Sequence, residues 1–276
     1  MKKLLALLLP LVFVFGCDDG DNTQHVQLTQ CSVSEAVVTF PSAELPTAET
    51  KEKYVVTYTE TSATIAVYEA DDGGKFDRNA ARTISMAFDE ADDGRLLEII
   101  YSSYDPTTYI SEKYSYLNDM DIVKQVTEVI EGEIAFQRSF TLHIPPQNAV
   151  GMYVMRNMLN EDVLYVFENN NLVKIGQQSE DGDVPFDNKK WRIVTTYEYD
   201  ERPNAAKDIV IAMLTFGIDS PIRYSKNNVI RETHLLTDGT SERLYNSPTY
   251  THDGMLATYY LESKQRNLTF EYDCQQ

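Results

Sequence analysis

The chain has 276 residues and a strongly acidic composition, with 43 Asp and Glu against 24 Lys and Arg and a formal net charge of −19. Such a surface repels phosphate backbones and anionic lipid headgroups, which argues against nucleic-acid binding and against adhesion to a membrane through a basic patch. The length is enough for one large β domain or two smaller domains.

The first residues are typical of a secretory signal, with Lys2 and Lys3 before an apolar run over residues 4–15. This run is too short to span a bilayer comfortably. Its end, Val14-Phe15-Gly16-Cys17, resembles a bacterial lipobox. The resemblance implies that residues 1–16 are removed, which takes the formal charge from −19 to −21, and that Cys17 carries acyl chains such as palmitate. The alternative is an ordinary signal peptide with an incidental cysteine.

Residues 17–30 are predicted to form a flexible acidic tether, because they contain few large apolar groups and no periodic pattern. Acidic residues directly after a lipidated cysteine, here Asp18, Asp19 and Asp21, also resemble the surface-export signal of some Gram-negative gut bacteria. The resemblance implies a lipid-anchored protein of the outer membrane, displayed on the cell surface. A tether that faces the periplasm is the alternative.

Two further cysteines, Cys31 and Cys274, flank the rest of the chain. In an oxidising compartment this even count permits one disulfide, with two separate thiols as the alternative. The bond requires the two ends of the domain to lie side by side, with Cα atoms within about 7 Å, so it predicts a sheet that nearly closes.

From Tyr54 onwards the dominant pattern is an alternation of apolar and polar residues, which predicts strands with one buried face. The alternation is clearest over residues 54–59, 191–199 and 267–272. Turn-forming clusters separate such runs and favour tight hairpins: Asp71-Asp72-Gly73-Gly74, Asp92-Asp93-Gly94, Glu131-Gly132, Asn169-Asn170-Asn171, Asp181-Gly182, Asp238-Gly239 and Asp253-Gly254. The fold class predicted is all-β, a large curved antiparallel meander.

Two stretches lack this alternation, residues 145–159 and the apolar residues 205–216, the latter suited to a short helix or a buried strand. We expect at most one or two short helices, placed in these stretches. Since no linker rich in Pro, Gly or Ser divides the chain after residue 50, residues 31–276 are predicted to be a single β-rich domain.

Three segments share a theme in which an aromatic strand ends in Asp and a turn: Tyr197 to Asn204, Tyr250 to Leu256 and Phe270 to Cys274. They resemble the strand–turn unit of YD-repeat proteins. With residues 224–232 and the lipoprotein start, their order resembles a family of uncharacterised bacterial lipoproteins whose domain of unknown function is porin-like in fold. The resemblance implies an incompletely closed barrel and no established activity. The chain departs from it at Ala205 and Val229, where the family often has Pro.

The residues themselves favour the same architecture, because many strands joined by short turns must curl or close to protect their edges. A barrel that spans a membrane is less favoured, since acidic residues occur through many of the strands and a lipid anchor would be redundant.

The sequence offers little catalytic chemistry. The four histidines, His25, His143, His234 and His252, are not at a metal-ligand spacing, so we expect no metal, no cofactor and no catalytic residue. Acidic loops at 69–77, 89–93 and 181–187 lack the spacing of an EF-hand and fit solvated turns. Carboxylates are too numerous for a glycosidase pair to be singled out.

Aromatic residues on a concave sheet face could stack on sugar rings or cover a lipid chain, although most should pack in the core. Trp191, the single tryptophan, is the candidate for stacking.

Together these features predict a lipid-anchored cell-envelope protein, a surface-displayed binding or structural module with the membrane and a glycan or lipid as partners. The alternatives are a periplasm-facing half-barrel carrier that shields an apolar ligand, and a polysaccharide-active enzyme. A carrier needs a deep apolar cavity, a glycan binder needs a shallow aromatic groove, and an enzyme needs convergent carboxylates or a nucleophile with its base.

Overall fold

The structure, a computed structural model, describes residues 31–41, 49–90, 95–146, 149–156 and 161–274. Over these residues the chain forms seventeen strands. They are β1 (Cys31–Pro41), β2 (Glu49–Tyr58), β3 (Ser62–Glu69), β4 (Arg82–Phe88), β5 (Leu96–Ser102), β6 (Tyr109–Tyr116), β7 (Asp121–Ile130), β8 (Glu133–His143), β9 (Gly151–Arg156), β10 (Asp162–Glu168), β11 (Asn171–Gln178), β12 (Val184–Phe186), β13 (Lys189–Pro203), β14 (Asn227–Leu235), β15 (Ser241–Tyr250), β16 (Leu256–Leu261) and β17 (Arg266–Cys274).

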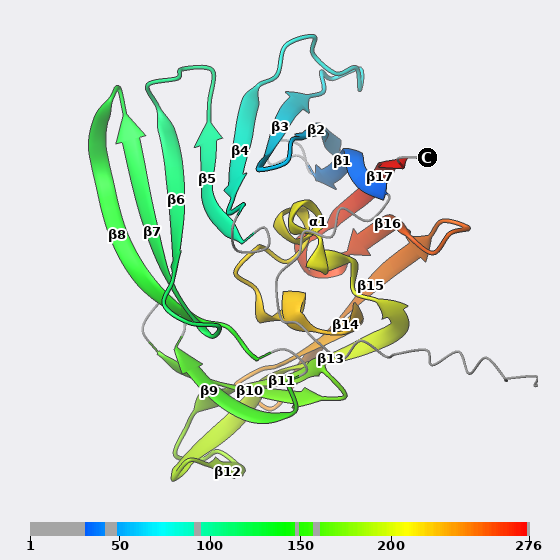
Figure 1. Cartoon of the computed structure of the whole chain (residues 1–276). Helices are drawn as coiled ribbons and strands as arrows, with labels where there is room; N and C mark the ends of the chain where they lie inside the picture. Colours follow the sequence, from blue (N-terminus) through cyan, green and yellow to red (C-terminus); the bar gives the residue numbers. More distant parts are fainter. Residues whose placement is uncertain (1–30, 42–48, 91–94, 147–148, 157–160, 275–276) are drawn as a thin grey trace, which may run out of the picture.

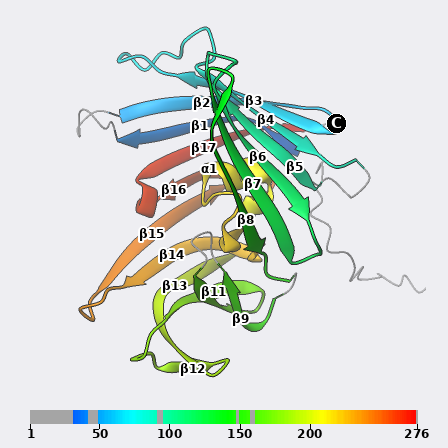
Figure 2. The ribbon, with the colours of Figure 1, turned by 90° about the vertical axis from the view of Figure 1, so that its left-hand side faces the viewer.

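The strands pair around a ring that stays open at one place. Neighbours in sequence pair as antiparallel hairpins from β1 to β8 and from β9 to β17, except that β11 pairs directly with β13 and short β12 folds onto β13. Pairing of β1 with β17 joins the two halves. Within the described residues β8 pairs only with β7 and β9 only with β10, and we call the opening between β8 and β9 the seam (Figure 1; Figure 2). The predicted all-β, incompletely closed barrel is confirmed.

The sequence alternation appears as alternating burial along the strands. Tyr54 and Val56 of β2 are buried, as are Leu268 and Phe270 of β17, whereas the residues between them are more exposed. Glycines at the predicted turns have φ angles of 76° to 84°, a region that side chains with a Cβ rarely adopt: Gly74, Gly132, Gly239 and Gly254.

Between β13 and β14 the chain leaves the wall and crosses the inside of the ring. Residues 204–226, here called the plug, contain the 3-10 turns η1 (Ala205–Lys207) and η2 (Pro221–Tyr224) and the helix α1 (Ile209–Leu214). Figures 1 and 2 both show α1 surrounded by strands. Its apolar residues join the main core with wall residues such as Ile65 and Ile84, so protein fills the space that a pore would need.

The plug explains which of the two irregular stretches forms a helix. Asp208 caps α1, since its carboxylate accepts hydrogen bonds from the N–H groups of Val210 (2.8 Å) and Ile211 (3.2 Å). Residues 145–159 contain a strand, β9, and no helix over their described part, so α1 in the second stretch meets the expectation of at most one or two short helices. The reason for the strand is tertiary, because β9 finds a full antiparallel partner in β10.

The buried side chain of Asn204 ties the two ends of the plug together. The amide nitrogen of Asn204 donates to the carbonyls of Ile222 and Ser225 (both 3.0 Å), and its oxygen accepts from the N–H of Ala206 (2.9 Å). Satisfying several backbone groups with one buried amide stabilises a single plug conformation.

Candidate binding site at the seam

The seam lies where strand pairing is interrupted by proline. Residues after β8 run through Pro145 and Pro146, which have no N–H to donate to a ladder. The next strand, β9, begins at Gly151, whose φ of 103° is in the region that favours glycine. The strands β8 and β9 therefore follow each other in the sequence without pairing, and the ring stays open between them.

An inner cavity of about 190 Å³ lies behind the seam, between the wall and the plug. The wall contributes Tyr114 and Tyr116 of β6 and Leu142 of β8, and the plug contributes Ile218 and Pro221. Aromatic and aliphatic groups thus line most of the cavity, which is the composition that small-molecule sites usually have.

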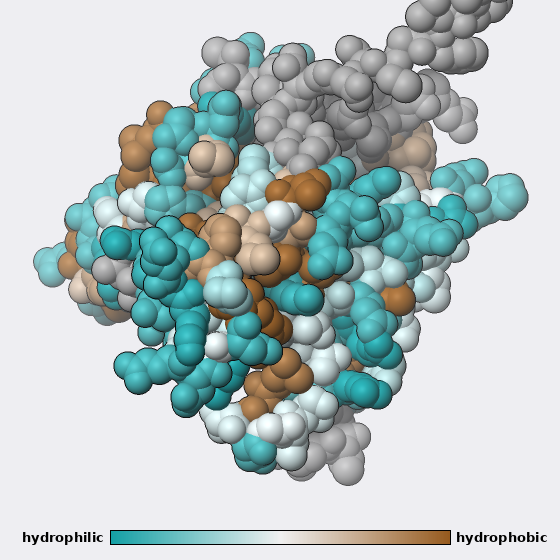
Figure 3. All heavy atoms as spheres, turned by 90° about the horizontal axis from the view of Figure 1, so that it is seen from below, coloured by the Kyte–Doolittle hydropathy of each residue, from teal (hydrophilic) through white to brown (hydrophobic). Residues whose placement is uncertain are grey.

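A wider groove of about 610 Å³ lies outside this cavity. The groove and the cavity share the lining residues His143, Ile144 and Arg156, so they adjoin each other, and we call the two together the seam cleft. Met120 and Met152 line the groove and are 49 % and 41 % exposed. Viewed from below, hydrophobic residues form a band across the middle of the molecule between hydrophilic flanks (Figure 3). Flexible methionines allow such a groove to adapt to different apolar shapes.

The polar groups of the outer groove are paired across short distances. His143 Nδ1 lies 2.5 Å from an oxygen of Asp121, and Arg156 Nε lies 3.3 Å from an oxygen of Asp162. Hydrogen bonds from Asn118 and His143 hold the pKa of Asp121 below its usual range. These pairs frame the entrance without leaving a strong net charge there.

A buried ion cluster ties the plug to the wall beside the inner cavity. Lys124 of β7, 5 % exposed, places its ammonium 2.5 Å from Asp219 of the plug and 3.0 Å from Glu112 of β6. The hydroxyl of Tyr114 donates to Glu112 (2.9 Å). Both carboxylates are engaged by the same cation, so this cluster is arranged to hold two segments together.

The tyrosines of the inner cavity keep their hydroxyl protons. Burial is the main cause that raises the pKa of Tyr116 to about 12, and it also raises the pKa of Tyr114 and Tyr165. The hydroxyl of Tyr116 donates to the carbonyl of Leu96 (3.0 Å), so its polar tip is satisfied while its ring faces the cavity. The surface presented to a ligand is therefore mostly apolar.

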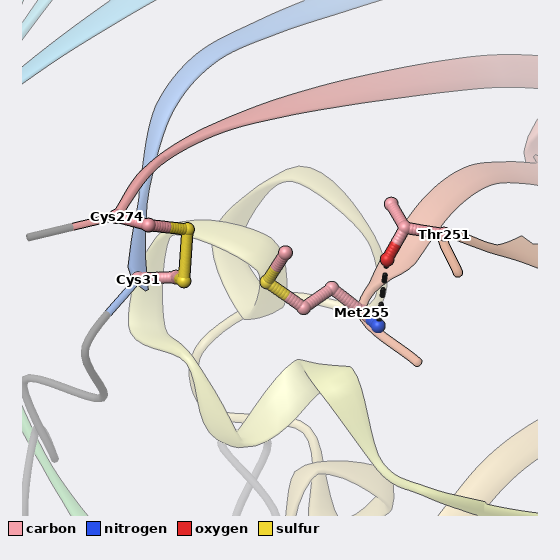
Figure 4. Close-up of a disulfide and its surroundings, with 4 residues drawn as sticks. All are labelled: Cys31, Thr251, Met255 and Cys274. Atoms are coloured by element: carbon pink, nitrogen blue, oxygen red, sulfur yellow. Dashed lines mark hydrogen bonds between the residues drawn. A yellow bond between two sulfur atoms is a disulfide. The ribbon is translucent and has the colours of Figure 1, made fainter. Parts of the chain in front are cut away.

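The predicted disulfide is present. Cys31 and Cys274 are direct partners in the β1–β17 ladder and are joined through their sulfur atoms (Figure 4). The bond closes the ring on the side of the molecule where the two ends of the domain meet. Cys17, Asp18, Asp19, Asp21 and His25 lie outside the described residues, so the lipid anchor and the acidic tether stay predictions.

Trp191 does not serve as a stacking surface in this structure. Its side chain is fully buried in a small cluster with Leu164 and Val166, and its indole N–H donates to the carbonyl of Phe186 (3.0 Å). A Cβ on Gly182 would collide with the Trp191 backbone, so the loop before β12 packs tightly over it. The expectation of ligand stacking is corrected, because the strand alternation that marked Trp191 also marks core positions.

The remaining histidines sit among local partners. His234 Nδ1 lies 3.2 Å from the hydroxyl of Thr195, and His252 follows β15 in a turn. Among the described residues no three His, Cys, Asp or Glu side chains gather as metal ligands would. A search of the same residues for a helix long and apolar enough to cross a membrane finds none.

Sequence reasoning missed the seam cleft, and the first two YD-like motifs turn out to contact each other across the strands that flank the plug. Asp200, within the first motif, accepts from the N–H of Asn228 (3.1 Å) and from the hydroxyl of Tyr250, which begins the second motif. The motif spacing was visible, but the pairing of the two motifs depends on the barrel. The proline pair after β8 was the sequence signal for the seam.

Comparisons with known proteins give little beyond this geometry. No family model matches the chain, and no curated protein matches it. One solved structure that it resembles is a porin-like protein from Bacteroides uniformis ATCC 8492, at 11 % identity and a TM-score of 0.32, over 87 % of this chain and 96 % of that chain. A TM-score this low supports no conclusion about function. Resemblance to a lipoprotein family therefore stays a prediction.

Proposed function

We propose that the chain is a lipid-anchored cell-envelope protein that binds a small, largely apolar molecule in the seam cleft. The single observation that carries the proposal is the inner cavity, lined by tyrosines and aliphatic side chains and reached through the groove. This cavity favours the carrier-like alternative over a glycan binder, because Trp191 is buried and the apolar lining is enclosed between wall and plug.

An enzyme is less favoured on the same geometry. The carboxylates that converge beside the cavity, Glu112 and Asp219, are both bound to Lys124 and are not free to act as an acid and a base. Anchoring through Cys17 and display on the cell surface belong to the same proposal and rest on the sequence alone. Labelling of cells with a fatty-acid probe should mark the wild-type chain and leave Cys17→Ala unlabelled.

Binding is tested with N-phenylnaphthylamine, a neutral apolar dye that fluoresces when it leaves water. The full-length exported chain with Cys17→Ala is used, because removal of the acyl chains avoids detergent micelles that would take up the dye. We expect saturable binding. Ile144→Trp, at the junction of cavity and groove, should weaken it at least tenfold, because the larger ring fills the cleft.

The matched control is Leu97→Trp, which adds a similar ring at a position that is 39 % exposed and does not line the cleft, since Leu97 alternates along β5 with the buried, cavity-lining Leu96. It should bind the dye as the parent does, with an unchanged melting temperature. If the dye fails to bind, or if both tryptophan variants bind it equally well, the seam cleft is not a binding site.

A further inference from the structure

One charged group in the seam cleft lacks a counter-ion. Arg223 lies on the η2 turn of the plug, lines the inner cavity and is only 9 % exposed. The other ionisable groups around the cavity have partners, since His143, Arg156 and Asp219 each make the contacts given above. In the part of the chain that the structure describes, the guanidinium of Arg223 forms no ion pair and donates no hydrogen bond to a side chain.

An unpaired buried cation is costly, since its hydration is lost without a compensating partner. Proteins usually place a carboxylate against such a group, and this chain has 43 acidic residues from which to supply one. Asp208 is near enough for its charge to be felt, but it forms no ion pair with Arg223, and burial raises the pKa of Asp208 itself. Among the described residues no carboxylate offsets this cost, which is what a site for an anionic ligand would show.

The position of Arg223 is fixed by the backbone around it. Ser220 caps η2 by accepting the N–H of Ile222 (3.4 Å), and Pro221 begins the turn. The Asn204 amide holds the carbonyls of Ile222 (3.0 Å) and Arg223 (3.4 Å) from the other side. These bonds fix the backbone from which the Arg223 side chain extends, so the turn itself need not rearrange when an anion binds.

We propose that Arg223 recognises the anionic head of the ligand, so that the seam cleft takes an amphiphilic organic anion such as a carboxylate with an apolar body. This inference rests on the proposed function. A guanidinium matches the two oxygens of a carboxylate or sulfonate in a bidentate fork. The apolar lining then contacts the rest of the molecule. An inorganic anion is not favoured, because the chain's net charge of −19 repels it and nothing apolar compensates.

The test compares two dyes of the same aromatic frame, neutral N-phenylnaphthylamine and the anionic anilinonaphthalene sulfonate, on the full-length chain with Cys17→Ala. Arg223→Met should weaken the sulfonate about tenfold, as expected for a lost charged hydrogen bond, and leave the neutral dye within about twofold. Arg223→Lys should fall between, since an ammonium keeps the charge without the fork. Arg243→Met, which removes an exposed arginine, is the matched control and should change neither dye.

A second readout separates recognition from a structural role. Removal of an unpaired buried charge should leave the melting temperature of Arg223→Met equal to or above that of the parent. If that variant fails to fold, the Arg223→Lys comparison decides alone. The inference is overturned if the sulfonate binds both Arg223 variants as well as the parent, or if both dyes weaken together. If the neutral dye does not bind the parent at all, the proposed function fails first.

Discussion

The two sides of the barrel are built in opposite ways. On the closed side β1 and β17 pair along eight residues of each strand, the disulfide joins them, and the residues that face inwards pack against α1. At the seam β8 and β9 form no ladder over the described residues, and the plug is held to the wall by the Lys124 cluster. The two ends of the domain are thus paired and cross-linked, whereas the opposite side is unpaired, and it is there that we propose a ligand binds.

The largest loss of stability should come from removing the disulfide on the closed side. The disulfide joins residues 243 positions apart, and by the chain-entropy model such a loop contributes on the order of 5 kcal/mol, a figure that strain commonly reduces. Reduction, or Cys274→Ser, should lower the melting temperature and loosen β1 and β17 before the seam. Free-thiol labelling of both cysteines in natively exported protein would contradict the closed side as described.

The next largest loss of stability should come from loosening the plug, which contacts both sides of the barrel. Asn204→Ala leaves the carbonyls of Ile222 and Ser225 buried without their donor, so we expect a loss of about 3 kcal/mol in unfolding free energy. Denaturant unfolding measures it. Asn267→Ala, at an exposed position of β17, should cost about 0.5 kcal/mol or less. Equal losses in the two variants would mean that Asn204 does not anchor the plug.

A smaller change in stability should appear at alkaline pH, and it reports on the burial of Tyr116 beside the seam. Burial is the main cause that raises the pKa of Tyr116 to about 12, so the folded chain keeps its proton at a pH where the unfolded chain loses it. The stabilisation is present below the unfolded pKa of about 10 and is lost as the pH rises from there towards 12. Tyrosinate absorbance should show this, and Tyr116→Phe should reduce the pH dependence. If Tyr116→Phe leaves the pH dependence of stability unaltered, the Tyr116 hydroxyl is exposed to water and the description of the cavity is wrong.

Much of the fold could be predicted from local patterns. Alternation over residues 54–59 and 267–272 marked strands, and Asp-Gly turns marked hairpins, because both depend on neighbouring residues alone. The pairing of Cys31 with Cys274 followed from compartment and even count. These features need no knowledge of which strands meet across the barrel.

The candidate site could not be predicted in the same way. The inner cavity joins residues of six strands, β5 to β10, and of the plug, and no local pattern records that meeting because Leu96 and Tyr224, which both line it, are far apart in the chain. Arg223 looks like an ordinary surface arginine in the sequence, and only its burial, with no ion pair among the described residues, sets it apart. Trp191 is the opposite case. As the single tryptophan it was singled out as a ligand contact, but its place in the strand alternation is that of a core residue.

The central claim is that the seam, and not the closed side, is where a ligand binds. Hydrogen exchange measured by mass spectrometry on the full-length Cys17→Ala chain, with and without saturating N-phenylnaphthylamine, tests it most directly. The account predicts added protection in residues 113–125, 142–146, 152–156 and 218–224, with no change in β1, β2, β16 and β17. Protection confined to the closed side, or no change at the seam while the dye is bound, would contradict it.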